Sequence, residues 1–383
     1  MTSSLPSNGS GEHVLHIVGH VTEAVFSFMG PTTDALARSG FKQTVVMLDH
    51  PRHSHLRAKF HESIRIEPIQ PGGRDLRHWF QMAKVIRVLV SQRQYAAVHL
   101  HGFLPWALGT RLGRLLPRQV PVYYSPHGSR TLTLLKPVQA TLSSLMALTG
   151  SGKPQVIAST ALDAQRVAGL GSARVKTVEA AVDDDFFHVE RHEARRPLVV
   201  SGDPDDNHRS VELFCRQAVQ LSAAELGLSF NWIGHIDPLV AARLKAANVG
   251  SFPLADRKEM TSRLAAGWVF LAAGSADEFP VMLSWAMALG MPCLAADTPH
   301  HRDLIQDGVT GLLYKSEEDA LVKISQLIDN KALRDRLGAA AKQQALERHS
   351  KATLYQGILG AYARGQLPRQ ATLHTDEAEG RAA

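Results

Sequence analysis

Cysteines, long apolar runs and an N-terminal targeting signal are what this sequence most clearly lacks. The two cysteines, Cys215 and Cys293, lie in apolar surroundings without metal-binding or redox spacing. This excludes a disulfide framework and favours a reducing compartment. No window approaches the roughly 20 apolar residues that a membrane-spanning helix needs. The opening MTSSLPSNGSGEH has neither the basic nor the apolar region of a signal peptide, so the sequence predicts a cytoplasmic protein.

Acidic residues are also missing, but only from one stretch. No aspartate or glutamate occurs between Leu76 and Leu162. The same stretch contains the basic residues Arg77, Lys84, Arg87, Arg93, Arg111, Arg114, Arg118, Arg130, Lys136 and Lys153. Their positive field can attract a phosphate-bearing acceptor or an anionic membrane, with the protein peripheral on its inner face, or it can belong to a solvated face without a partner. Nucleic acid is not expected, because no helix-turn-helix, zinc or RNA-binding signature accompanies the charge.

Short apolar runs alternate with helical patterns along nearly the whole chain. The runs that predict strands of a first sheet are 14–18, 44–48, 96–100, 120–124, 155–158 and 175–178. Those that predict strands of a second sheet are 198–200, 228–233, 249–253, 268–272 and 292–296. Such alternation is typical of parallel sheets covered by helices. The predicted fold class is α/β, with two Rossmann-like doubly wound domains facing a cleft.

The charged, aperiodic stretch DDDFFHVERHEARRP at 183–197 separates the two series of strands. We interpret it as a linker. The N-terminal domain is then expected at 13–182 and the C-terminal domain at 198–349, followed by a helix at 350–365 that returns to the N-terminal domain. The polar ends, 1–12 and 366–383, are expected to be disordered.

Residues 274–314 combine an acidic loop, a helix and a short strand. The loop carries Asp277 and Glu278, and Pro280 suits the first turn of the helix that follows at 281–289. A helix N-terminus favours anions, so this loop is a candidate site for a phosphorylated ligand. Glycine-containing turns follow other predicted strands, where ligands of such sheets bind. With two domains, the expected place for the ligand is the cleft between them.

A series of landmarks in this order resembles the GT-B glycosyltransferases of family 4, also called group 1, over roughly residues 13–365. The landmarks are VHLH at 98–101, VPVYYSPHG at 120–128, VKTVEAAVDDDFF at 175–187, FNWIGH at 230–235, FPVMLSWAMALGMPCLAAD at 279–297 and DGVTGLLY at 307–314. The resemblance implies sugar transfer with retention from a nucleotide sugar, such as a UDP- or GDP-sugar, to a polysaccharide, exopolysaccharide or lipid-linked saccharide. It implies no metal and no cofactor, because basic residues and helix N-termini meet the charge on the leaving diphosphate.

The resemblance also implies roles for individual residues. His127, Asp277 and Glu278 are the expected catalytic residues. The expected donor-binding residues are Gly19, His20, Gly202, Arg209, Gly234, His235, Phe279, Pro280, Val281 and Trp285. His101, Ser125 and Arg130 are expected on the acceptor side. For Asp277 and Glu278, capping of the following helix is the structural alternative, and for His101 a structural role is equally open.

Among the departures from the family pattern, two make the donor-binding motif degenerate. Trp285 stands where the family has a glutamate that holds the ribose hydroxyls, and an indole cannot accept a hydrogen bond from them. Trp285 is also readily explained as a core aromatic. Asp203 follows Gly202 where an arginine is usual, and a carboxylate there repels a diphosphate. An alternative therefore stays open, a catalytically inactive glycosyltransferase-like subunit that binds or scaffolds.

Overall fold

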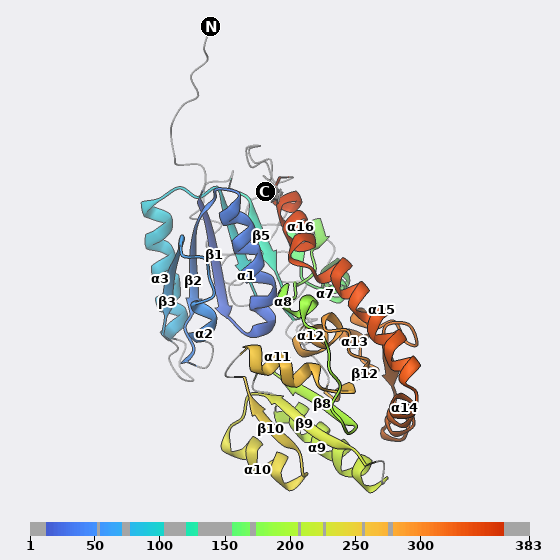
Figure 1. Ribbon diagram of the computed structural model, residues 1–383. Coiled ribbons are helices and arrows are strands. Elements are labelled where there is room, and N and C mark those ends of the chain that lie inside the picture. Colours follow the sequence, from blue (N-terminus) through green and yellow to red (C-terminus); the bar gives the residue numbers. More distant parts are fainter. Residues whose placement is uncertain are drawn as a thin grey trace, which may run out of the picture.

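Two parallel β-sheets, each packed against helices, form the protein (Figure 1). The computed structural model describes residues 13–51, 54–70, 77–102, 120–128, 155–168, 174–205, 208–224, 227–254, 257–274 and 279–363. The predicted α/β fold class with two Rossmann-like domains is confirmed. The ends predicted to be disordered, 1–12 and 366–383, lie outside the described residues.

The first sheet has the strand order β3-β2-β1-β4-β5-β6-β7. Its strands are β1 (His13–His20), β2 (Lys42–Leu48), β3 (Ile64–Ile69), β4 (Ala97–His101), β5 (Val122–Ser125), β6 (Gln155–Ala158) and β7 (Arg174–Thr177). β2 and β4 are buried along nearly their whole length, which is why they appear as apolar runs. The sequence pattern misses β3, because this edge strand contains Pro68 and charged residues.

The second sheet has the strand order β10-β9-β8-β11-β12-β13. Its strands are β8 (Leu198–Asp203), β9 (Ser229–Gly234), β10 (Gly250–Pro253), β11 (Val269–Ala272), β12 (Cys293–Ala296) and β13 (Leu312–Tyr314). All of its pairings are parallel. Strands β8 and β11 are parallel neighbours, so their carboxyl ends lie at the same edge of the sheet. Helix α9 follows β8 in the chain, and α12 follows β11.

The described helices of the N-terminal half are α1 (Glu23–Arg38), α2 (Ser54–Arg57), α3 (Arg77–Gln92), α7 (Ala161–Ala168) and α8 (Asp185–His188). Those of the C-terminal half are α9 (His208–Ala223), α10 (Pro238–Ala246), α11 (Arg257–Ala265), α12 (Val281–Ala288), α13 (Pro299–Leu304), α14 (Glu317–Asp329), α15 (Lys331–His349) and α16 (Lys351–Ala363). Helix α1 begins after Thr22, whose side chain caps it, and it continues through Pro31 in its interior. Of the described helices, none has the length and apolar character needed to cross a membrane.

The stretch 183–197, interpreted as a linker, is anchored to the second domain. Its short helix α8 buries Phe186 completely. Arg191 donates to the carbonyl oxygens of Gly267 at 2.8 Å and Gly290 at 3.0 Å. These buried contacts hold the connection in one geometry, although its charged sequence resembles that of a solvent-exposed segment.

Helix α16 lies against the N-terminal domain, beside α1 (Figure 1). The ring of Tyr362 stacks on Tyr123 of β5, with centroids 4.2 Å apart. Lys176 of β7 donates to the carbonyl oxygen of Gly357 at 2.6 Å. The chain therefore passes from the first domain to the second and returns, so that two connections join the domains.

Candidate functional site

Four histidines gather toward the carboxyl end of the first sheet. His16 lies on β1, His99 and His101 lie on the neighbouring β4, and His127 follows β5. His16 lies opposite His99 in the strand register. Alternate residues of a strand point to the same face, so His99 and His101 are neighbours, with ring centroids 4.0 Å apart. The fold thus brings together two predicted site residues, His101 and His127, with two that the sequence did not single out.

Hydrogen bonds connect three of these rings from the interior to the edge of the sheet. His16 Nδ1 lies 3.1 Å from His101 Nε2, and His101 Nδ1 lies 3.0 Å from His127 Nε2. Burial lowers the pKa of His16 to about 4 and the pKa of His127 to about 3. Burial also holds the pKa of His99 and His101 well below the usual histidine value. The four imidazoles are therefore neutral near pH 7.

The backbone at His127 is strained. Its φ of 45° lies in the left-handed region, which costs a non-glycine residue about 1–2 kcal/mol. Gly128 follows with φ 90°, and its N–H donates to Asp163 of α7 at 3.3 Å. Strain of this kind persists only where surrounding contacts fix the geometry. Here the bond to His101 and the turn held by α7 are those contacts.

His99 and Ser125 belong to a second hydrogen-bonded series inside the sheet. His99 Nε2 lies 2.9 Å from the Ser125 hydroxyl, which donates to the carbonyl oxygen of Ile157 at 2.7 Å. His99 Nδ1 lies 2.8 Å from the Tyr362 hydroxyl. Ser125 is fully buried, so its hydroxyl serves the sheet rather than an accessible acceptor surface.

Among the described residues, one group of ring nitrogens is close enough together to share a metal ion. It comprises His16, His99 and His101, whose candidate ligand atoms lie within 4.8 Å of one another. Each ring is already hydrogen bonded, to another histidine or to Gln43, Ser125 or Tyr362. The cluster is therefore complete as a network of neutral side chains, and the expected absence of a metal site stays a prediction.

The second domain meets the carboxyl end of the first sheet on both sides of β5. After β1, the N–H of Glu23 lies 3.5 Å from Asp205 Oδ1, in the loop after β8. After β6, the first two N–H groups of α7 donate to Asp303 Oδ2 of α13, at 3.0 and 3.4 Å. Strand β5 lies between β1 and β6 in the sheet. His127, at the end of β5, therefore lies in the junction between the domains.

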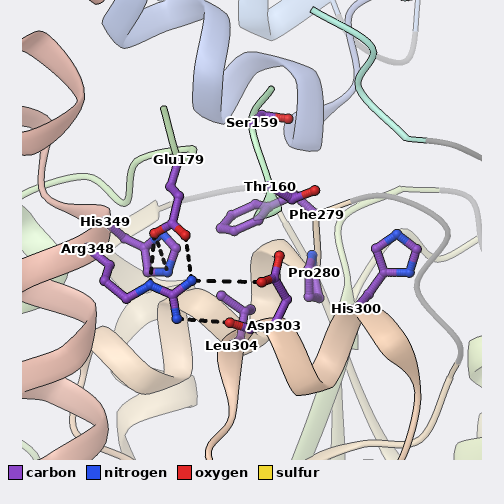
Figure 2. Close-up of a pocket in the computed structure, with 10 residues that line it drawn as sticks. All are labelled: Ser159, Thr160, Glu179, Phe279, Pro280, His300, Asp303, Leu304, Arg348 and His349. Atoms are coloured by element: carbon purple, nitrogen blue, oxygen red, sulfur yellow. Dashed lines mark hydrogen bonds and ion pairs between the residues drawn. The ribbon is translucent and has the colours of Figure 1, made fainter. Parts of the chain in front are cut away.

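Figure 2 shows a pocket beside this junction. Its lining residues are Ser159, Thr160, Glu179, Phe279, Pro280, His300, Asp303, Leu304, Arg348 and His349. Arg348 of α15 donates to Glu179 Oε2 at 2.9 Å and to the carbonyl oxygen of Asp303 at 2.9 Å. Phe279 and Pro280, two expected donor-binding residues, thus lie on the wall of a pocket that both domains line.

The three glycines predicted to bind the donor, Gly19, Gly202 and Gly234, each have a structural role in β1, β8 or β9. In β8, a Cβ added at Gly202 would overlap the carbonyl oxygen of Ile233. In β9, a Cβ added at Gly234 would overlap the carbonyl oxygen of Asp203. Gly19 is the extra residue at an irregularity in the β1–β2 pairing, so β1 continues through it instead of ending there.

Helix α12 places Trp285 in the core. The side chain is 5% exposed, and its ring stacks on Phe186 of α8 with centroids 5.0 Å apart. The Arg257 guanidinium lies 5.9 Å from the centre of the indole. Trp285 therefore faces the linker helix, as expected of a core aromatic. Val281 is buried at the first position of the helix, and Pro280 occupies the N-cap rather than the predicted first turn.

The remaining predicted residues are placed as follows. Arg209 is exposed in the first turn of α9, and the N–H of His235 donates to the carbonyl oxygen of Asp203 at 3.1 Å. His20 ends β1, but its side chain is not described. The expected catalytic residues Asp277 and Glu278, and the acceptor-side Arg130, lie outside the described residues.

Several residues of the junction were missed at the level of sequence. His16 is hidden in the apolar run 14–18, and Asp303 lies between the landmarks at 279–297 and 307–314 without belonging to either. Glu179 lies within a landmark segment, yet its partner Arg348 comes 169 positions later. A polar residue inside an otherwise apolar strand is the one local signal that could have indicated His16.

Comparisons with known proteins support both halves of this arrangement. The model of Glycosyltransferase Family 4 matches residues 32–186, and the model of Glycosyl transferases group 1 matches residues 232–344. A search of curated protein sequences found no match.

Solved structures resemble the chain over almost its whole length. Sucrose-phosphate synthase from Thermosynechococcus elongatus aligns with a TM-score of 0.73 at 13% identity, over 91% of this chain and 98% of that one. A glycosyltransferase from Rickettsia africae aligns with a TM-score of 0.71 at 13% identity, over 92% of this chain and 98% of that one. Anabaena HepE, solved with UDP and glucose, aligns with a TM-score of 0.73 at 14% identity, over 92% of this chain and 100% of that one.

At these identities the structural likeness shows the fold, and the two family models supply the classification. The chain belongs to the GT-B glycosyltransferases, with a family 4 domain followed by a group 1 domain.

Proposed function

We propose that this protein transfers a hexosyl-type sugar from a nucleotide sugar, such as a UDP- or GDP-sugar, to a polysaccharide or lipid-linked saccharide, with retention at the anomeric carbon. The observation that carries the proposal is the position of His127 in the junction between a family 4 domain and a group 1 domain. HepE, a structurally similar protein, is solved with UDP and with UDP-glucose. This supports a nucleotide sugar as the donor.

The chemistry of the junction suits a reaction without a bound metal. Charge develops on the leaving diphosphate, and fixed donors have to meet it. Helix α9 begins after β8 and carries the exposed Arg209 in its first turn. Its N-terminal N–H groups favour an anion. The neutral imidazole of His127 can hydrogen bond to a sugar without adding charge beside the anomeric carbon.

A second candidate function is a glycosyltransferase-like subunit that has lost transfer and only binds or scaffolds. The observation that favours it is Trp285, which stands in the core where the family pattern has a carboxylate. Asp203 and Asp205 also take part in the structure, because the N–H of Asp205 donates to Asp203 Oδ1 at 3.1 Å. Binding of a nucleotide sugar without turnover, with any acceptor, would support this candidate.

We also propose that helix α3 binds an anionic membrane surface, which would bring the protein to a lipid-linked acceptor. Phe80 is 73% exposed and Val88 is 43% exposed. Lys84 and Arg87 are exposed on the same side of the helix. A basic helix with exposed apolar residues can lie on anionic lipid. Vesicles of anionic lipid should therefore co-sediment the protein, the K84E/R87E variant should bind less, and neutral vesicles should bind neither protein.

Calorimetric titration of the full chain with UDP, GDP and their glucose conjugates tests donor binding directly. We expect saturable binding of one nucleotide series, and R209A should weaken it because a cation near the diphosphate is lost. R216A, a change of another arginine of α9, is the matched control and should bind as the unchanged protein does. Absence of binding to every nucleotide and nucleotide sugar would contradict the proposed function.

A further inference from the structure

The hydrogen-bonded rings of His16, His101 and His127 have donor and acceptor roles that are fixed at the His16 end. Gln43 Nε2 lies 2.8 Å from the carbonyl oxygen of Thr33, and Gln43 Oε1 lies 3.1 Å from His16 Nε2. A carbonyl oxygen can only accept, so the amide nitrogen has to be the atom that faces Thr33. The amide oxygen then faces His16 and can also only accept. His16 must therefore carry its proton on Nε2.

The same logic passes outward from ring to ring. A neutral imidazole with a proton on Nε2 has a bare Nδ1, so His16 Nδ1 accepts and His101 Nε2 donates across their 3.1 Å contact. His101 Nδ1 is then bare and accepts from His127 Nε2 across 3.0 Å. His127 is left with a proton on Nε2 and a bare Nδ1. No hydrogen bond among the described residues engages that Nδ1.

The neighbouring ring of His99 is fixed in the same tautomer by independent contacts. Ser125 uses its one hydroxyl proton to donate to the carbonyl oxygen of Ile157 at 2.7 Å. The serine oxygen must therefore accept from His99 Nε2. His99 Nδ1 is then bare and accepts from the Tyr362 hydroxyl at 2.8 Å. Every proton in the cluster is accounted for by neutral rings, without a second ring proton and without a metal ion.

We propose that Gln43, acting through His16 and His101, is a positioning residue that holds His127 in the Nε2-protonated tautomer and so presents a bare Nδ1 at the domain junction. This inference rests on the proposed function and deepens it. A bare imidazole nitrogen accepts hydrogen bonds and donates none. The site therefore takes a sugar that offers a hydroxyl or amide proton to His127, and it disfavours a uronate carboxylate at that point, which has no proton to offer.

Nitrogen NMR of the ligand-free full chain, labelled with ¹⁵N-histidine, tests the tautomer without any need for activity. The His127 signals are assigned by their loss in H127Q. We expect one protonated nitrogen, Nε2, and one bare nitrogen, Nδ1, in slow exchange. A proton on His127 Nδ1, or a doubly protonated ring at neutral pH, would overturn the proposal. Shifts of His16, His99 and His101 on adding zinc alone would overturn it too, since they would show a metal site.

The variant Q43M removes the fixed acceptor while nearly preserving side-chain volume. Donors and acceptors can then exchange along the rings of His16, His101 and His127, so His127 should show a mixture of both tautomers. Q217M removes another buried glutamine, on α9 of the second domain, and should leave the His127 signals unchanged. If Q43M keeps the single tautomer of the unchanged protein, the positioning role is wrong. If Q43M does not fold, the tautomers of His16 and His101 in the unchanged protein test the relay, and a proton on Nδ1 of either ring would overturn it.

Titration with UDP-glucose separates this inference from the proposed function. If both hold, the sugar nucleotide shifts the His127 Nδ1 signal, UDP shifts it much less, and UDP-glucuronate binds at least tenfold more weakly than UDP-glucose. If the tautomer is as proposed but no nucleotide or nucleotide sugar binds, the proposed function fails and the tautomer assignment stands. If UDP-glucose binds and leaves Nδ1 unshifted, the role of His127 in sugar recognition fails.

Discussion

The indole of Trp285 stacks on the ring of Phe186, with 20° between the ring planes. The contact joins α12, the helix after the expected donor loop, to α8 in the connection between the domains. Trp285 therefore joins the second domain to the connection between the two domains.

Replacing Trp285 by alanine should destabilise the protein by about 3–5 kcal/mol, because a large buried aromatic leaves a cavity. F186A should cost a similar amount, and the double variant should cost clearly less than the sum, since the two rings share one contact. Urea unfolding of the three variants measures this. Additive losses would show that the two rings do not support each other.

Replacing Asp303 by alanine should cost about 0.5–2 kcal/mol, the usual value for a lost helix cap. The carboxylate accepts from two N–H groups of α7 across the domain junction. D335A is the matched control, because Asp335 is exposed and forms an ion pair with Lys331 within the same helix. Equal midpoints of urea unfolding for D303A and D335A would be the contrary result.

Stability should rise with pH between about pH 4 and 6.5, in part through His16. Burial lowers the pKa of His16 from 6.5 to about 4 in the folded protein. In this window the unfolded chain binds a proton that the folded chain does not, so acid favours unfolding. Each such histidine adds up to about 1.4 kcal/mol per pH unit.

Urea unfolding at a series of pH values measures that slope. H16F should reduce the slope by the share of one proton, and the other buried histidines keep the remainder. A slope in H16F as steep as in the unchanged protein would argue that His16 is already charged or exposed when folded.

Replacing Gly202 by alanine should destabilise the second domain by about 1–3 kcal/mol, as overpacking does. The added Cβ would overlap the Ile233 carbonyl oxygen and approach Met282 Cε to 2.7 Å. The control is G360A in α16, where the nearest atom is the flexible Lys176 Nζ at 3.2 Å. Alanine in a helix is better than glycine by about 0.5–1 kcal/mol, so thermal unfolding should separate the two variants in opposite directions.

Both sheets follow from local sequence patterns, but only in part. The apolar runs behind β1, β2 and β4 predict buried strands because helices cover both faces of the sheet. Edge strand β3 escapes detection, since Pro68 and the charged residues around it are typical of a loop. Helix α13 escapes as well, because six residues are too few to show a helical period.

The site is harder to predict from the sequence than the fold is. His101 and His127 can be found because they follow predicted strands. Gln43 cannot be found, because only the pairing of β1 with β2 brings it to His16, 27 positions earlier. The resemblance to a family placed Trp285 at a ligand, whereas packing against Phe186 places it in the core. Strand pairing between distant segments and side-chain packing decide these positions, and a local sequence pattern predicts neither.

The measurement that tests the account most directly is a transfer assay with the full chain. Nucleotide sugars are supplied with a lipid-linked saccharide, and release of the nucleoside diphosphate is followed together with the anomeric configuration of the product. The account predicts transfer with retention for the unchanged protein and a loss of at least about 100-fold in H127A, the range for a positioned catalytic group, with the fold kept. Binding without transfer, or an H127A variant as active as the unchanged protein, would contradict it.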